Sequence, residues 1–122
     1  MANEIAGIYS RLSQDDGNTG ESGSIQTQKT LLTQYCKEHH IPIGDYYCDD
    51  GWSGTNFDRP DFKRMLDDIE AGKINVVIVK DLSRFGREYA QMGMYIEHYF
   101  EEKGVRFISV AENIDSSKGT DN

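Results

Sequence analysis

The chain has 122 residues, of which 37% are hydrophobic and 28% charged, and 21 acidic against 13 basic side chains leave a net charge of −8. This length fits one domain with a modest core, and no apolar run approaches the ~18–20 residues that a membrane-spanning helix needs. The charge alone argues against a nucleic-acid binder, because neutralising phosphates requires a cationic surface. No basic stretch followed by an apolar segment opens the chain, so we expect no signal peptide, a cytoplasmic location, and free thiols at Cys36 and Cys48.

Short apolar runs alternate with amphipathic segments, which predicts alternating strands and helices. Strands are expected at residues 5–9, 43–48, 74–79 and 105–110. Helices are expected from a serine cap at Ser22 or Ser24 to about residue 39, from residue 58 to Gly72, and over residues 88–103. The polar remainder, residues 111–122, contains nothing that would close a structure. The alternation predicts a flavodoxin-like, three-layer α/β domain whose mostly parallel sheet of four to five strands is flanked by helices.

The first helix has an apolar face that is expected to point inward. Its predicted inward residues are Ile25, Leu32, Tyr35, Cys36 and His39. The other histidines are expected on the surface or in packing, so none is well placed as a catalytic base.

Hydroxyl groups and arginines follow the predicted strands, at the sheet edge where parallel α/β folds bind ligands. They are Tyr9, Ser10, Arg11 and Ser13 after the first strand, Asp49, Asp50 and Arg59 after the second, and Lys80, Asp81, Ser83, Arg84 and Arg87 after the third. Arginine forks suit phosphate oxygens, and a hydroxyl beside them is a candidate nucleophile. This edge therefore predicts phosphoryl-transfer chemistry.

Other site classes fit less well. The chain has no glycine-rich phosphate loop and no Gly-x-Ser-x-Gly elbow. A regulatory switch of the response-regulator type shares the strand pattern but needs acidic residues after the first strand, where this chain has Arg11 and Ser13. A metal-dependent nuclease needs several carboxylates at the strand ends, where only Asp49 and Asp50 qualify.

Five sequence blocks, in order, resemble the catalytic domain of the serine recombinases (the resolvase/invertase family). They are residues 9–13 (Tyr-Ser-Arg-Leu-Ser), 24–28 (Ser-Ile-Gln-Thr-Gln), 50–54 (Asp-Gly-Trp-Ser-Gly), 58–60 (Asp-Arg-Pro) and 80–87 (Lys-Asp-Leu-Ser-Arg-Phe-Gly-Arg). The resemblance extends from residue 5 to about residue 115. The long segment between Ser13 and Ser24 is similar to that of the large serine recombinases, especially those of mobile transposons.

The resemblance implies roles for individual residues. Ser13 would attack a DNA phosphate and form a 5′-phosphoserine link, without a metal or another cofactor. Arg11, Arg84 and Arg87 would hold the phosphate, with support from Arg59. Asp50 would orient an arginine or transfer a proton. Substrate binding at the edge of the site would involve Tyr9, Gln28 and Lys80. Ser83 stands where small resolvases carry an acidic residue, so the general acid and base stay open.

Simpler interpretations stand beside these roles. Tyr9 is also compatible with core packing, Gln28 with a solvent-facing position, and Asp50 with a loop cap. Arg59 is also compatible with a local ion pair. Ser10 and Ser24 are rival nucleophiles.

The resemblance also implies partners and a domain division. Residues 1–117 would form the catalytic domain, and residues 118–122 would begin a linker to an oligomerisation helix and DNA-binding domains. DNA would be bound mainly through those further domains, by a homodimer that assembles into a tetramer in the bacterial cytoplasm, away from membranes, to excise or integrate a mobile element. We also expect Ser13, in the absence of DNA, to lie apart from the point where Arg84 and Arg87 converge.

Overall fold

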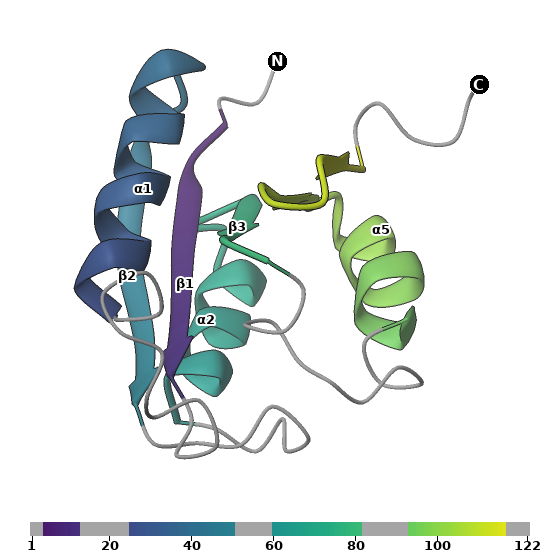
Figure 1. Cartoon of the computed structure of the whole chain (residues 1–122). Coiled ribbons are helices and arrows are strands. Elements are labelled where there is room, and N and C mark those ends of the chain that lie inside the picture. The colour runs from purple at the N-terminus through teal and green to yellow at the C-terminus, as the bar shows by residue number, and fades with distance from the viewer. Residues whose placement is uncertain (1–3, 13–24, 51–59, 82–92, 117–122) are drawn as a thin grey trace.

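A computed structural model describes residues 4–12, 25–50, 60–81 and 93–116. A sheet of five strands in the order β2-β1-β3-β4-β5 lies at its centre (Figure 1). The strands are β1 (Ala6–Leu12), β2 (Ile43–Asp50), β3 (Val76–Val79), β4 (Arg106–Ser109) and β5 (Ile114–Asp115). The first four are parallel and β5 is antiparallel to β4. The expected α/β fold with a mostly parallel sheet is therefore confirmed.

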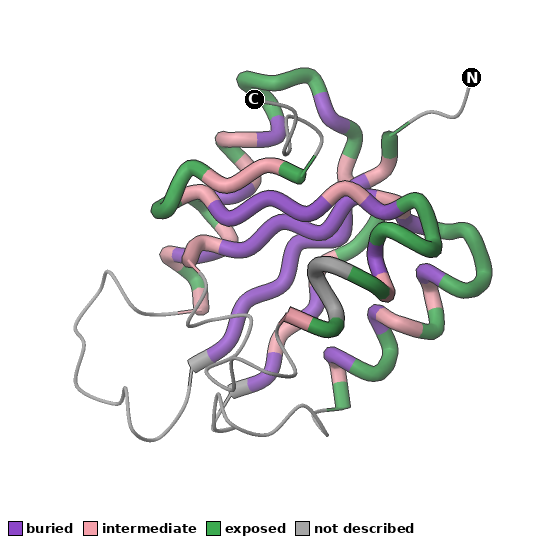
Figure 2. Tube along the Cα trace, turned by 90° about the vertical axis from the view of Figure 1, so that its right-hand side faces the viewer, coloured by how far each residue is buried: buried purple, intermediate pink, exposed green. Residues whose placement is uncertain are grey.

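Helices cover both faces of the sheet. They are α1 (Ile25–Glu38), α2 (Pro60–Glu70), and a π-helical segment η3 (Met94–Tyr99) that continues into α5 (Phe100–Lys103). Leu32 and Cys36 of α1 pack on one face with Ile8 and Ile78. The helices α2 and α5 pack on the other face. The strands between these layers form the buried centre of the molecule, as Figure 2 shows.

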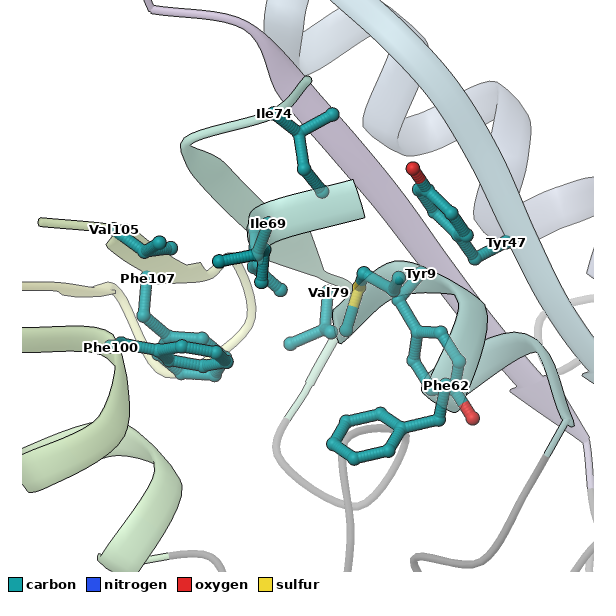
Figure 3. Packing of buried hydrophobic residues seen from close by; sticks show 11 residues of the cluster. Tyr9, Tyr47, Phe62, Ile69, Ile74, Val79, Phe100, Val105 and Phe107 are labelled. Atoms are coloured by element: carbon teal, nitrogen blue, oxygen red, sulfur yellow. The ribbon is translucent and has the colours of Figure 1, made fainter. Parts of the chain in front are cut away.

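The larger core cluster lies between the sheet and the helices α2 and α5 (Figure 3). The rings of Phe100 and Phe107 stack there with centroids 5.9 Å apart. Tyr9 meets Phe62 edge-on, at a centroid distance of 5.9 Å. Because α2 carries Phe62 and β1 carries Tyr9, this aromatic contact ties the start of α2 to the central strand.

The strands that lead to the predicted site are longer than expected. β1 continues past Tyr9 to Leu12, and β2 continues past Cys48 to Asp50. In the register of these strands, Arg11 pairs with Asp49 and Leu12 with Asp50. Polar residues interrupt the apolar pattern at these positions, although the backbone ladder continues. Arg11 and Asp49 thus lie within strands rather than in loops.

Two further expectations are corrected. Residues after Val110 do add to the fold, because β5 pairs with β4 and Asp115 forms an ion pair with Arg106 at 2.7 Å. His39, predicted to face inward, is exposed and stacks on the ring of Tyr35 at 4.0 Å. Gln28, which was not among the predicted inward residues, is buried one turn before Leu32 on the same face. The predicted start of the last helix, residues 88–92, lies outside the described residues.

Candidate active site at the carboxyl edge of the sheet

The central strand β1 carries Arg11 near its carboxyl end, between β2 and β3. Arg11 is completely buried and is among the largest side chains with no exposure. Pairing between β1 and β3 covers Ala6 to Ile8, so the backbone of Arg11 lies beyond it. A buried peptide group at such a position needs another hydrogen-bond partner.

Gln28 of α1 supplies that partner. Its side-chain amide donates to the carbonyl oxygen of Arg11 at 3.0 Å, and its Oε1 accepts the Arg11 N–H at 3.1 Å. The amide therefore takes the place of a neighbouring strand and holds the backbone two residues before Ser13. The solvent-facing interpretation of Gln28 is wrong.

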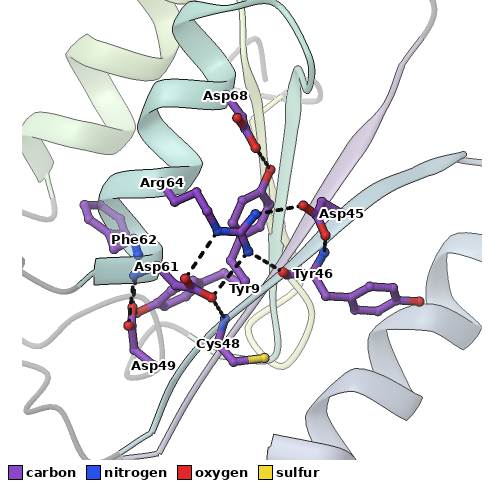
Figure 4. A network of polar contacts seen from close by, with 10 residues as sticks. Tyr9, Asp45, Tyr46, Cys48, Asp49, Asp61, Phe62, Arg64 and Asp68 are labelled. Carbon is purple, nitrogen blue, oxygen red and sulfur yellow. Dashed lines mark hydrogen bonds and ion pairs between the residues drawn. The ribbon is translucent and has the colours of Figure 1, made fainter.

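Asp49, near the end of β2, joins three elements at the same edge (Figure 4). Its Oδ2 accepts the hydroxyl of Tyr9 at 2.9 Å and the N–H of Phe62 at 3.0 Å, and its Oδ1 accepts the N–H of Asp61 at 3.0 Å. These two N–H groups belong to the first turn of α2, where helix N–H groups lack partners within the helix. Asp49 is therefore an N-terminal cap for α2 that comes from a distant strand.

Tyr9 lies near this edge with its side chain in the core. Its ring is fully buried against Phe62, and its hydroxyl donates to Asp49. The core-packing interpretation of Tyr9 therefore describes its ring. No signal in the sequence pointed to the cap, because Asp49 and Phe62 are 13 residues apart and the helix start carries its own acidic residue.

The carboxylate of Asp49 also bears on the metal-nuclease alternative. Its two oxygens accept hydrogen bonds from one O–H and two N–H groups. Hydrogen-bond donors therefore surround this carboxylate, whereas a Mg²⁺ site gathers several oxygen ligands around the ion. Within the described ranges, no three His, Cys, Asp or Glu side chains gather so as to hold a metal ion.

The open edge of β2 is covered by side chains of α2. Asp61 accepts the N–H of Cys48 at 2.8 Å, and Arg64 donates to the carbonyl oxygen of Tyr46 at 2.9 Å. Arg64 also bonds Asp45 at 2.8 Å, and this contact holds the pKa of the Asp45 carboxyl below its usual value. An edge strand whose backbone groups are taken up in this way is a poor template for pairing with another chain.

At the end of β3, Lys80 and Asp81 form a partly buried ion pair at 3.5 Å. Lys80 therefore lies at the predicted edge, with its charge beside a carboxylate. Ser10 points into the α1 side of the sheet and is completely buried, and among the described residues its hydroxyl has no hydrogen-bond partner. Burial argues against Ser10 as the nucleophile.

The structure thus brings Arg11, Gln28, Tyr9 and Lys80 to one sheet edge, together with the backbone of Asp50. Ser13, Ser24, Arg59, Arg84 and Arg87 lie outside the described residues, and so does the side chain of Asp50. The predicted distance between Ser13 and the arginines lies outside them as well. Cys36 and Cys48 are both free, as expected, and burial raises the pKa of the Cys36 thiol to about 11.

Comparisons with known proteins agree with this architecture. The family model "Resolvase, N terminal domain" matches residues 6–122. The catalytic domain of TP901-1 integrase superposes with a TM-score of 0.85 at 31% identity, over 95% of this chain and 84% of that chain. A resolvase family site-specific recombinase from Streptococcus pneumoniae gives a TM-score of 0.80 at 31% identity, over 97% and 79%.

A third neighbour is the catalytic domain of ISC1926 TnpA, an IS607-like serine recombinase. Its TM-score is 0.72 at 25% identity, and the match covers 87% of this chain and 70% of that chain. These comparisons lend no support to the response-regulator alternative. Among the described residues, no helix has the length and apolar character required to cross a membrane. A family match over residues 6–122, on a fold shared with serine recombinase catalytic domains, means that this chain belongs to the resolvase family and is a catalytic domain of site-specific DNA recombination.

Proposed function

We propose that this domain cleaves and rejoins DNA with Ser13 as its nucleophile. The observation that carries the proposal is the place of Arg11 at the carboxyl edge of the central strand, two residues before Ser13, in a chain of the resolvase family. The planar fork of an arginine suits the oxygens of a phosphate. In a chain of the resolvase family, that phosphate is the scissile phosphate of DNA.

The chemistry is a reversible phosphoryl transfer. The Oγ of Ser13 forms a bond to phosphorus and loses its proton, while the bond from phosphorus to the 3′ oxygen breaks and that oxygen takes up a proton. The product is a 5′-phosphoserine ester and a free 3′-hydroxyl. Because the ester keeps the phosphodiester energy, rejoining is the reverse reaction and requires no ATP.

The remaining site residues support this transfer. Arg11, Arg84 and Arg87 stabilise the negative charge of the pentacoordinate transition state, with Arg59 beside them. Asp50 orients an arginine or moves a proton, and Lys80 contributes a cation at the edge. Gln28 and Tyr9 act from the buried side, since neither side chain is exposed.

Substitution of the nucleophile tests the proposal. In the complete recombinase, Ser13→Ala should abolish the covalent protein–DNA adduct on a denaturing gel while binding to the recombination site persists. Ser10→Ala is the matched control and should keep adduct formation, because the Ser10 hydroxyl is buried. Adducts that persist in Ser13→Ala would refute the proposal. Cleavage that vanishes in EDTA would favour the metal-nuclease alternative.

We also infer that residues 1–117 are the catalytic unit, and that DNA affinity and assembly into dimers and tetramers come mainly from other segments. The net charge of −8 supports this division, because such a unit repels a polyanion. A bacterial cytoplasmic protein that excises or integrates a mobile element fits the chemistry, and a structural neighbour is itself an integrase.

A further inference from the structure

Asp49 lies between β1, the strand that carries Arg11, and the first turn of α2. Asp49 is only 3% exposed, and its carboxylate accepts hydrogen bonds from the Tyr9 hydroxyl on one side and from two N–H groups of α2 on the other. Tyr9 stands two residues before Arg11 on β1, about 7 Å along a strand that rises ~3.3 Å per residue. Arg59 is the residue immediately before Pro60, with which α2 begins.

The contact between β2 and α2 is reciprocal. Asp49 accepts the N–H of Asp61, and Asp61 in turn accepts the N–H of Cys48. Two carboxylates thus join the end of β2 to the start of α2 in both directions. This arrangement leaves α2 little freedom to shift or rotate against the strand, because either movement would leave a buried carboxylate or N–H group without its partner.

We propose that Asp49 is a positioning residue for the recombination reaction: it sets the first turn of α2, and so Arg59, relative to the strand that carries Arg11. The proposal rests on the proposed function, in which both arginines serve one phosphate. Asp49 does not touch DNA in this role. It acts through Tyr9 on β1 and through the N–H groups of Asp61 and Phe62 on α2.

The chain offers a matched pair of variants for the test. Tyr9 and Tyr47 are both fully buried, and each donates its hydroxyl to a carboxylate: Tyr9 to Asp49 at 2.9 Å, and Tyr47 to Asp68 at 2.6 Å. Tyr9→Phe breaks the link from Asp49 to β1. Tyr47→Phe breaks an equivalent bond to Asp68, which lies farther along α2, away from its first turn.

The measurement is the single-turnover rate of adduct formation by the complete recombinase at saturating DNA, well below the unfolding temperature. We expect Tyr9→Phe to be roughly tenfold slower than wild type and Asp49→Asn roughly a hundredfold slower, because misplacement by about 1 Å costs up to ~10²-fold. Tyr47→Phe should stay within about twofold of wild type even though it loses a similar bond. DNA affinity should be unchanged in all three.

Coupling to Arg59 gives a second readout that a purely structural role would not produce. In an Arg59→Ala background, Tyr9→Phe should slow adduct formation less than about threefold, because the relative position of the two arginines no longer matters. Tyr9→Phe that matches Tyr47→Phe in rate, or that keeps its full effect without Arg59, would overturn the positioning role. Ser13→Ala separates this failure from failure of the proposed function, since adducts formed without Ser13 would refute the latter alone.

Discussion

Replacing Gln28 by leucine removes both hydrogen bonds that the Arg11 backbone receives from α1, at nearly constant side-chain volume. The N–H and the carbonyl oxygen of Arg11 then lie buried without these partners, at a cost of about 1–3 kcal/mol each. The added apolar contacts of leucine offset about 1 kcal/mol of this loss. We therefore expect the free energy of unfolding to fall by about 1–5 kcal/mol, which is a large part of the stability of a small domain.

Urea denaturation followed by circular dichroism measures this difference. Gln26→Leu is the matched control, because Gln26 lies on the exposed side of the same helix and bonds only weakly to Thr30, at 3.4 Å. It should change the free energy of unfolding by less than about 0.5 kcal/mol. A Gln28→Leu domain that is as stable as Gln26→Leu would refute the view that Gln28 replaces a strand beside Arg11.

Three further outcomes are expected. Arg64 lowers the pKa of Asp45, and a carboxyl group with a lowered pKa stabilises the fold only while it is ionised. As the pH falls below the ordinary Asp pKa of about 3.9, wild type should therefore lose this stabilisation, whereas Arg64→Ala does not have it at any pH. Parallel acid-unfolding curves for the two proteins would contradict this. Cys36 should resist iodoacetamide at pH 8 until the domain is unfolded, since its thiol is buried and its pKa is raised to about 11; rapid labelling in native buffer, read by mass spectrometry, would disprove it. Residues 1–122 alone should bind a recombination-site duplex more weakly than micromolar in a low-salt gel shift, because a net charge of −8 repels DNA; a tight shift would reveal a cationic surface.

The covered edge of β2 has a consequence for assembly. Asp61 and Arg64 of α2 occupy backbone groups of Cys48 and Tyr46 that another strand would otherwise pair with. Arg64 also lies over the ring of Tyr47, 4.3 Å from its centroid. The sheet is therefore protected from extension by another strand on this side.

Local patterns in the sequence were sufficient for the four parallel strands, for the helices α1 and α2, and for the family. The β-branched run at Val76–Val79 predicts a buried parallel strand because burial on both faces demands apolar side chains at every position. The five sequence blocks between Tyr9 and Arg87 indicate the family because they occur in order at the ends of the predicted strands, although no single block is decisive. Each block is a short local pattern, so no knowledge of distant contacts was required.

Contacts between distant residues decided the rest. Gln28 reads as a polar helix residue, but it is buried and bonds the Arg11 backbone, 17 residues away, which has no paired strand on the side of β3. Asp49 reads as a loop carboxylate or a metal ligand, yet it caps a helix that starts 11 residues later and holds a tyrosine 40 residues earlier. β5 has two residues and gains its stability from β4 and from the pair of Arg106 with Asp115. A polar side chain takes its role from the partner that folding brings to it, and only the tertiary structure supplies that partner.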